Sequence, residues 1–268
     1  MAIITLATPA DPRIAEYAAV GDPELAQRSG LFVGEGRLLV RRLLQDGRYR
    51  VRSLLVSDAA QQQLADVLVQ LDAEVPVFVC PMQSFRDITG FNLHRGCVAL
   101  VERPPQPDVR QLLAGARLVV ALESIANPDN VGGVFRNAAA FGADAVLVDS
   151  ATGDPLYRKA IRTSMGAALQ VPFARVDAVS ATVSELRGQG FTVVALTPAA
   201  DAAPLAEVAA RCASDRVAIV VGHEGEGLTV ATLDACEVRA RIPMADGVDS
   251  LNVAAATAIA FYAMRRAG

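Results

Sequence analysis

The stretch Ile242-Pro243-Met244-Ala245-Asp246-Gly247-Val248-Asp249-Ser250-Leu251-Asn252 runs without a break into an apolar segment, residues 253–262. A buried helix seldom starts with so many polar and backbone-exposing residues unless the loop before it has a task. The stretch also follows a predicted strand, residues 237–242, and parallel α/β sheets place ligand loops at the carboxyl ends of strands. The sequence therefore predicts that this loop binds a cofactor.

Length and composition indicate the fold class. The chain has 268 residues, enough for two ordinary domains, and 52% of them are hydrophobic but only 5% aromatic. A core built mainly from Ala, Val and Leu favours α/β layers over an aromatic-rich β-sandwich. We expect a compact, helix-rich α/β protein.

A second polar stretch follows a predicted buried strand, residues 117–122. The polar turn that ends at Asn130 is expected to cap a helix over residues 131–141 that stops at Gly142. Two glycines in the first turn of this helix each cost about 1 kcal/mol relative to Ala. They predict the close approach of another backbone or of a ligand.

Arg136 lies in the same predicted helix, among Ala, Val and Phe residues. It has two readings of similar weight. It could form a structural ion pair with a nearby carboxylate such as Asp149, because such pairs are common, or it could act on a substrate.

Two further strands end in polar turns. Residues 191–196 lead to Thr197-Pro198, and residues 216–221 lead to Gly222-His223-Glu224-Gly225-Glu226-Gly227-Leu228. The second turn lacks the Gly-Lys-Ser/Thr ending of a phosphate loop and the spacing of a dinucleotide fingerprint. Several such turns in one domain predict a pocket of backbone amides and carbonyls, suited to a neutral or cationic adenine-containing ligand.

The N-terminal part alternates strands and helices and predicts a small α/β domain. Asp11-Pro12 is a plausible start of a first helix. The other expected strands are residues 31–33, 51–57, 75–79 and 97–101, and the other expected helices include residues 37–44 and 59–71.

Residues 37–52 contain six arginines and a single acidic residue, Asp46. This patch is either an ordinary solvated helix and turn or a nucleic-acid contact, and Arg37, Arg41 and Arg42 are its candidate RNA-binding residues. The segment Tyr157-Arg158-Lys159 with Arg162 forms a second, weaker basic group.

Prolines mark the boundary between the two halves. Three prolines within residues 104–107 favour an extended connector. We expect a domain at residues 1–103, a linker and lead-in at 104–116, and a second domain at 117–268.

Several classes of protein are disfavoured. The net charge of −4 argues against a generally cationic nucleic-acid binder, although a local patch can still bind phosphate. The four cysteines and two histidines have no metal-ligand spacing, so no metal site is expected. With no signal-peptide pattern and no run of membrane-spanning length, the protein is expected to be soluble and cytoplasmic.

Taken together, the three polar stretches resemble the three motifs of the SpoU (TrmH-like) RNA ribose 2'-O-methyltransferases of the SPOUT class. The motifs are Asn130-x-Gly132-x-x-x-Arg136 with Phe141-Gly142, then Gly222-x-Glu224-Gly225-x-Gly227-Leu228, then Ile242-Pro243-Met244 followed by Ser250-Leu251-Asn252-Val253. The resemblance spans roughly residues 117–266. It implies a parallel α/β domain whose C-terminal part forms a trefoil knot, a feature that periodicity does not reveal.

The N-terminal part resembles, more loosely, the substrate-binding domain that some of these enzymes carry. Phe32-Val33-Gly34-Glu35-Gly36 and Leu93-His94-Arg95-Gly96 are the segments concerned. That module is similar to a ribosomal RNA-binding protein, so the resemblance favours a nucleic-acid contact over an ordinary solvated surface as the role of the arginine patch.

The resemblance implies S-adenosyl-L-methionine as cofactor, held in the knot chiefly by main-chain groups. The resemblance favours Arg136 as the activator of the hydroxyl. We expect Arg136 to clamp the adjacent phosphate and to stabilise the developing alkoxide, while Asn130, Ser250 and Asn252 orient groups by hydrogen bonds. A guanidinium is a poor base, and His223 occupies a variable family position. The implied cofactor-binding residues are Thr197, Gly222, Ile242, Met244 and Leu251, and the implied catalytic residues are Asn130, Arg136, Glu224, Ser250 and Asn252.

The function implied is methyl transfer to an RNA ribose 2'-hydroxyl, with large-subunit ribosomal RNA favoured by the appended domain. The alternatives are a transfer RNA ribose methyltransferase and an inactive RNA-binding or ribosome-assembly factor. Family members are typically homodimers through the knotted domain. The apolar segment 253–264 fits either such an interface or a core helix.

Overall fold

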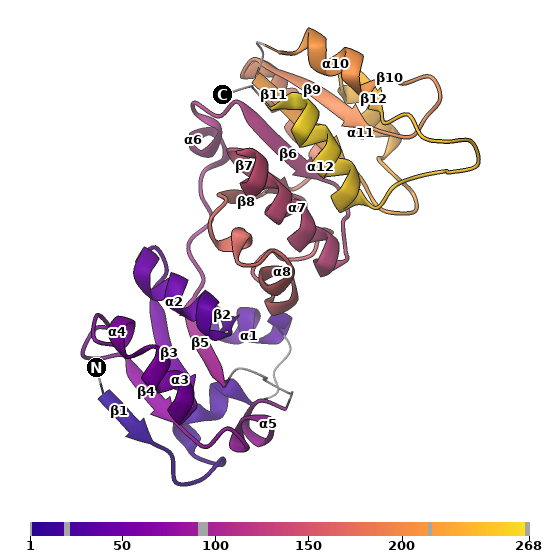
Figure 1. Ribbon diagram of the computed structural model, residues 1–268. Coiled ribbons are helices and arrows are strands. Elements are labelled where there is room, and N and C mark those ends of the chain that lie inside the picture. The colour runs from indigo at the N-terminus through magenta and orange to yellow at the C-terminus, as the bar shows by residue number, and fades with distance from the viewer. Residues whose placement is uncertain (1, 19–21, 91–95, 214–215, 266–268) are drawn as a thin grey trace. The chain divides into compact units, whose positions relative to one another are not determined.

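The computed structural model describes residues 2–18, 22–90, 96–213 and 216–265 (Figure 1). Its contacts divide the chain into two compact units: residues 1–105 with 156–158, and residues 106–155 with 159–268. The α/β class expected from composition is found in both units. Segment 91–95, which includes His94 and Arg95 of one motif above, lies outside the described residues.

The first unit contains a five-stranded mixed sheet in the order β1-β4-β3-β5-β2. Strands β1, β4 and β3 are parallel, whereas β5 is antiparallel to both β3 and β2. The strands are β1 (Ala2–Thr5), β2 (Leu31–Glu35), β3 (Val51–Val56), β4 (Pro76–Val79) and β5 (Cys97–Glu102). The helices are η1 (Pro12–Tyr17), α1 (Asp22–Ser29), α2 (Arg37–Asp46), α3 (Asp58–Gln63), α4 (Ala65–Leu68) and α5 (Ser84–Thr89).

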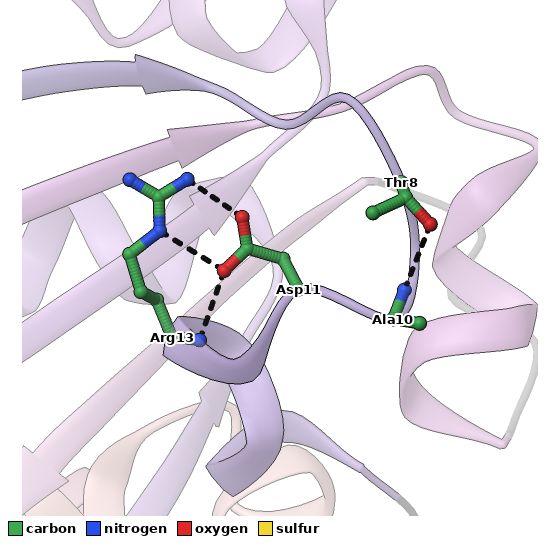
Figure 2. A network of polar contacts seen from close by, with 4 residues as sticks. All are labelled: Thr8, Ala10, Asp11 and Arg13. Carbon is green, nitrogen blue, oxygen red and sulfur yellow. Dashed lines mark hydrogen bonds and ion pairs between the residues drawn. The ribbon is translucent and has the colours of Figure 1, made fainter.

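Asp11 starts the first helical segment, as its position before Pro12 predicts. Figure 2 shows its carboxylate accepting bonds from the Arg13 backbone N–H and Nε, both at 2.9 Å, and from Nη2 at 2.6 Å. The Arg13 side chain is the main reason that the pKa of Asp11 falls to about 2. Nearby, the Ala10 N–H donates to Thr8 Oγ1 at 3.3 Å.

One expectation for this unit was wrong, and two elements were missed. Residues 59–71 do not form one helix, because the chain leaves helical geometry at Leu64 (φ −106°, ψ 2°) between α3 and α4. Strand β1 was not expected, and its formation depends on pairing with residues 76–79, far away in sequence. Helix α5 was also missed, because six residues carry little periodicity.

The second unit contains a seven-stranded, wholly parallel sheet in the order β10-β12-β9-β11-β6-β7-β8. The strands are β6 (Leu118–Leu122), β7 (Ala145–Val148), β8 (Phe173–Arg175), β9 (Phe191–Leu196), β10 (Ala203–Pro204), β11 (Arg216–Val221) and β12 (Val238–Arg241). The helices are α6 (Val109–Leu113), α7 (Pro128–Phe141), α8 (Arg158–Thr163, of which 159–163 belong to this unit), η2 (Ala167–Leu169), α9 (Val179–Gly188), α10 (Leu205–Arg211), α11 (Val230–Ala235) and α12 (Val253–Met264).

Burial on both faces explains why the strands of this sheet are continuously apolar. Along β6, Val120 and Leu122 join the hydrophobic cluster that includes residues of α7 and α12, whereas Val119 and Ala121 join the cluster that includes residues of α9. All four are fully buried. Full burial of a Val or Leu side chain contributes about 1.5–3 kcal/mol, so β6 anchors both layers.

Helices α7 and α12 pack against each other on one face of the sheet (Figure 1). A Cβ at Gly133 would lie 2.6 Å from the Ala254 Cβ, and a Cβ at Gly132 would lie 2.6 Å from the Ala160 carbonyl oxygen. The close approach predicted for the two glycines is therefore confirmed, and the approaching groups are α12 and α8. Asn137 Nδ2 adds a bond of 2.6 Å to the Ala254 oxygen.

The start of α7 differs from the expectation. Asn130 does not cap the helix, because α7 begins at Pro128 and Asn127 accepts the capping bond from the Asp129 N–H at 2.9 Å. The proline at the first helical position explains the earlier start. The end is as predicted, with Gly142 in the left-handed region at φ 72°.

No helix within the described residues combines the length and the apolar character needed to cross a bilayer.

Candidate functional site

Three loops at the carboxyl ends of neighbouring strands enclose a cavity of about 350 Å³. Because β9, β11 and β12 are parallel and adjacent, the loops that follow them emerge at the same edge of the sheet. The first loop contributes Thr197 and the second contributes residues 222–225 and Gly227. The third loop is the stretch 242–252, which also leads into α12.

All five residues implied as cofactor contacts line this cavity: Thr197, Gly222, Ile242, Met244 and Leu251. Of the implied catalytic residues, Glu224 and Ser250 line it too. The sequence reading missed several further lining residues, although most lie in or beside the same motifs. They are Leu196, Pro198, Val221, His223, Gly225, Gly227, Asp249, Val253 and Ala256.

The turn after β11 is tight because its two ends bond to each other. His223 and Gly227 exchange backbone hydrogen bonds of 3.1 and 3.0 Å. A Cβ at Gly222 would lie 2.4 Å from the Gly227 oxygen, so only glycine fits there without moving the backbone. Gly227 has φ 72°, a left-handed backbone conformation that favours glycine at this position too.

His223 holds this turn from within. Its Nδ1 accepts hydrogen bonds from the Gly225 N–H at 3.0 Å and from the Glu226 N–H at 3.2 Å. These two bonds assign the unprotonated position of the neutral ring to Nδ1, which leaves the ring proton on Nε2. His223 thus shapes the cavity wall, a role that its variable family position did not suggest.

One hydrogen-bond chain joins the three motifs beside the cavity. Asn252 Oδ1 accepts from the Ala254 N–H at 2.9 Å and so caps α12. Its Nδ2 donates to Asn130 Oδ1 at 2.8 Å, and Asn130 Nδ2 donates in turn to Glu224 Oε1. The cap fixes which way the Asn252 amide faces, and each bond then fixes the orientation of the next side chain.

Asn130 is buried in this chain of contacts, with 8% of its surface exposed, whereas Glu224 is exposed at the turn. Only one oxygen of the Glu224 carboxylate is engaged by the described residues. The second oxygen can therefore accept a hydrogen bond from a bound molecule. Ser250 is exposed on the opposite loop and forms no hydrogen bond with the described part of the chain.

Arg136 is set apart from the cavity. It is exposed on α7, does not line the cavity, and has no hydrogen-bond or ion-pair partner among the described residues. The reading in which Arg136 pairs with Asp149 is wrong. Asp149 is buried and accepts instead from the Ser124 N–H, the Thr152 N–H and the Thr152 hydroxyl.

Two buried acids hold the motif loops in place, and the sequence reading did not identify either role. Asp149 supports Ser124, whose φ of 58° is unusual for a residue with a side chain. Glu123, 6% exposed, accepts from the Thr229 N–H at 2.8 Å, from the Thr229 hydroxyl at 3.1 Å and from the Thr232 hydroxyl. Glu123 thereby fixes the end of the turn that carries Glu224.

The chemistry of the cavity fits S-adenosyl-L-methionine. Its walls offer apolar side chains such as Leu196 and Val253 for an adenine ring, with glycine backbone beside them. The charged lining side chains among the described residues, Glu224 and Asp249, are both acidic. Their sign suits a sulfonium cation and an ammonium group, and the volume lies within the range of small-molecule sites.

The candidate RNA-binding arginines of the first unit are not equally available. Arg41 is committed to Asp66 through two hydrogen bonds and to the Gln63 oxygen at 2.6 Å. This bonding lowers the pKa of Asp66. Arg42 is exposed and Arg37 half-buried on the same helix, α2.

No group of three or more His, Cys, Asp or Glu within the described ranges is placed to hold a metal ion. The pKa of the Cys97 thiol is raised to about 12 by burial, and that of Cys236 to about 11 by burial and by Glu123. These thiols are poor metal ligands and nucleophiles at neutral pH.

The fold is that of known RNA methyltransferases. An S-adenosylmethionine-bound ribosomal RNA methyltransferase from Sinorhizobium meliloti superimposes with a TM-score of 0.84 at 24% identity, covering 98% of this chain and 97% of that one. A solved RNA 2'-O ribose methyltransferase gives a TM-score of 0.76 at 28% identity, covering 98% and 97%.

Sequence comparison adds the family. Residues 117–262 match the SpoU rRNA Methylase family. A protein of Mycobacterium tuberculosis described as an uncharacterised tRNA/rRNA methyltransferase is 40% identical over 264 residues, which cover 97% of this chain and 91% of the relative. The chain belongs to the SpoU methylase family, as its three motifs predict.

Proposed function

We propose that the protein transfers a methyl group from S-adenosyl-L-methionine to a ribose 2'-hydroxyl of RNA, and that its substrate is large-subunit ribosomal RNA. Membership of the SpoU family makes the chain an RNA methyltransferase with this cofactor. The choice of the ribose 2'-hydroxyl as acceptor and of ribosomal RNA as substrate is proposed in addition to what family membership shows. The observation that carries the proposal is the hydrogen-bond chain Glu224–Asn130–Asn252, which unites the three motifs beside the cofactor cavity.

The cofactor supplies an already activated methyl group, so the protein needs mainly to align a hydroxyl and accept or disperse its charge. Thr197, Gly222, Ile242, Met244 and Leu251 would hold the cofactor. Asn130 and Asn252 orient Glu224, whose second oxygen faces no described partner and can take a hydrogen bond from the cofactor or the ribose. Ser250, exposed on the opposite wall, can hydrogen-bond the ribose.

Arg136 is assigned to the RNA and not to the cofactor, because it is exposed outside the cavity and has no described partner. A guanidinium there can clamp the phosphate next to the methylated ribose and stabilise the developing alkoxide.

The trefoil knot and the homodimer belong to the same proposal. Both are properties of the family that the motifs resemble, and the exposed apolar side chains of α12, Ile259 at 41% and Tyr262 at 59%, suit burial against a second copy. In this arrangement residues 117–268 form the methyltransferase domain, 104–116 the linker, and 1–103 the RNA substrate-binding domain. Sedimentation of the purified protein at several concentrations measures the assembly.

The test of the activity uses methyl-labelled S-adenosyl-L-methionine with unmodified ribosomal RNA and, separately, unmodified transfer RNA. Because a 2'-O-methyl group removes the hydroxyl that attacks in alkaline cleavage, the modified nucleotide shows as a gap in an alkaline ladder. Label in a base, seen as an intact ladder with label retained, would contradict the ribose assignment. Label found only in transfer RNA would favour the second candidate substrate, and no transfer to either RNA would favour an assembly factor.

The arginine patch is tested by replacing Arg41 and Arg42 with Glu. We expect weaker RNA binding with unchanged cofactor affinity, because both residues lie on α2 in the first unit. The single variant Arg41→Glu breaks the ion pair with Asp66 but keeps Arg42, so comparison with the double variant separates the loss of that pair from the loss of the Arg42 charge. Unchanged RNA affinity of the double variant at moderate salt would remove the patch from the RNA-binding surface.

A further inference from the structure

The loop after α8 exposes an apolar side chain on a backbone that disfavours side chains. Met165 has φ 54°, and among the described residues only Ser124 is another non-glycine with positive φ. Its surface is 63% exposed. Glycine would suit this position better for folding, so the presence of a long apolar side chain points to a use outside the core.

This loop is firmly held. The Met165 N–H donates to the Arg162 oxygen at 3.0 Å and the Gly166 N–H donates to the Ile161 oxygen at 2.9 Å. Ser164, 1% exposed, donates its hydroxyl to the Ile161 oxygen at 2.9 Å and accepts from the Ala168 N–H at 3.2 Å. The loop therefore presents Met165 from a rigid support.

The support lies against the first turns of α7, which carry Asn130. A Cβ at Gly132 would lie 2.8 Å from Thr163 Cβ and 3.1 Å from the Ser164 nitrogen. The Thr163 hydroxyl donates to Asp129 at 2.9 Å. The Met165 loop is thus packed two residues along α7 from Asn130, the central member of the hydrogen-bond chain beside the cavity.

Arg136 belongs to the same face of α7. Residues four apart on a helix are neighbours, so Arg136 follows Gly132 along the stripe that meets α8. Helical side chains also lean toward the N-terminus of their helix, which directs Arg136 toward the Met165 loop. One face of this unit therefore gathers an exposed apolar side chain and a guanidinium.

A second cation completes the surface. Arg162 is exposed at the end of α8 and forms no hydrogen bond or ion pair with the described residues, whereas Lys159 on the same helix is paired with Asp129 at 2.7 Å. An exposed apolar group on the same side of the unit as two exposed guanidinium groups matches an RNA strand, which alternates stacked bases with phosphates.

We propose that Met165 is an RNA wedge: it packs against the base next to the methylated nucleotide and holds that nucleotide unstacked, while Arg162 contacts the flanking phosphate. Apolar side chains, methionine included, separate neighbouring bases in this way in other nucleic-acid complexes. The occupant is an unpaired or extruded segment of RNA. This inference rests on the proposed function and adds how the ribose is brought to the cavity.

The test compares full-length Met165→Gly with the wild type in methyl transfer to unmodified large-subunit ribosomal RNA. Glycine relieves the backbone strain, so we expect an unfolding temperature equal to or above that of the wild type. We expect the rate of methyl transfer to fall about tenfold or more, because unstacking a base step is no longer supported. Stability and activity thus move in opposite directions, which a merely structural role would not produce.

Three further variants sharpen the comparison. Met165→Leu, which keeps an apolar side chain, is expected to retain activity within about threefold, and Arg162→Ala to raise the KM for RNA with the cofactor affinity unchanged. Val230→Ala is the matched control, since Val230 is a 73%-exposed apolar residue on α11 of the same unit. We expect it to leave activity unchanged.

A fluorescence measurement reads the unstacking directly. With 2-aminopurine placed beside the mapped nucleotide, wild-type binding is expected to raise the fluorescence and Met165→Gly binding to leave it low. If the wild type methylates RNA and the Met165→Gly variant does so at the same rate, the wedge role of Met165 is refuted and the proposed function still holds. A wild type that methylates no RNA would overturn both.

Discussion

Replacement of Glu123 by Ala tests whether a buried acid holds the turn that carries Glu224. The Glu123 carboxylate accepts three hydrogen bonds from Thr229 and Thr232, and Thr232 is fully buried. Hydrogen bonds to a charged acceptor contribute about 1.5–3 kcal/mol each. Thr229 is exposed and can turn to water, so the summed loss is smaller than three full bonds, roughly 3–5 kcal/mol.

Glu123→Gln should cost less. Its amide oxygen can still accept from the Thr229 N–H, and its NH₂ can donate to a rotated Thr232 hydroxyl, because the two threonine hydroxyls lie 3.1 Å apart and can bond each other. All three bonds lose their charged partner, but none of the groups is left wholly unsatisfied and no charge is buried any longer, so we expect a loss of about 1–2 kcal/mol.

Differential scanning calorimetry measures both variants. A loss of 1 kcal/mol lowers the unfolding temperature of a domain of this size by about 2–4 °C, so Ala predicts a fall of about 6–20 °C and Gln about 2–8 °C. Only the transition of the unit that contains residues 106–155 and 159–268 should move.

Glu226→Ala is the matched control, because Glu226 is an exposed glutamate of the same turn whose side chain has no described partner. We expect it to leave the unfolding temperature within about 1 °C. An unfolding temperature of Glu123→Ala within about 2 °C of the wild type, or equal to that of the control, would refute the role assigned to the buried acid.

Three other perturbations address the cofactor, the RNA and a surface acid. Arg136→Ala should lower the rate of methyl transfer by about 10²–10³, the typical effect of losing one charge-stabilising group, while calorimetry shows S-adenosyl-L-methionine binding within twofold of the wild type; loss of cofactor binding would contradict its placement. Gly222→Ala should weaken cofactor binding about 5- to 150-fold, because its Cβ would lie 2.4 Å from a backbone oxygen and such overpacking costs about 1–3 kcal/mol. Gly225→Ala, whose Cβ would meet only a His ring at 3.6 Å, should bind normally, and equal effects of the two would disprove the steric reason. The pKa of Asp11 is about 2, below its unfolded value of about 3.9, so its contribution to stability is present above about pH 4 and is lost as the pH falls toward 2; carboxyl NMR titration should show this midpoint, and Arg13→Ala should raise it toward 3.9.

The sequence predicted best those elements whose signals are local. Residues 216–221 and 253–264 have the predicted bounds, and Gly142 ends α7 as expected. The residues expected to bind the cofactor also line one cavity, because glycine and polar residues directly after apolar strands mark the ligand edge of a parallel sheet.

Features that depend on distant partners were missed. The exposed strand β1 exists through pairing with β4, and four residues carry no pattern of their own. Glu123 and Asp149 each follow an apolar strand, but the threonines that bind Glu123 lie more than 100 residues later. A single sequence gives no sign of such pairs, so the supporting groups of the site could not be assigned in advance.

Asn130 shows a related limit of prediction from the sequence. It was expected to end the turn just before the helix, but the helix starts earlier, at Pro128, and the Asn130 side chain bonds Glu224 and Asn252, 94 and 122 residues away. The residue type was informative, whereas its partners required the fold.

The parallel pairing of β6 with β11 also bears on how the chain is made. Leu118 pairs with Val217, so β6 waits for about 100 further residues before its neighbour β11 exists. At a synthesis rate of about 5–20 residues per second this wait lasts roughly 5–20 s. During that time β7 can pair with one edge of β6, while the edge that later receives β11 has no partner strand. A nascent chain arrested shortly after residue 200 should therefore expose a sheet edge that chaperones bind, and one arrested after α12 has emerged should not.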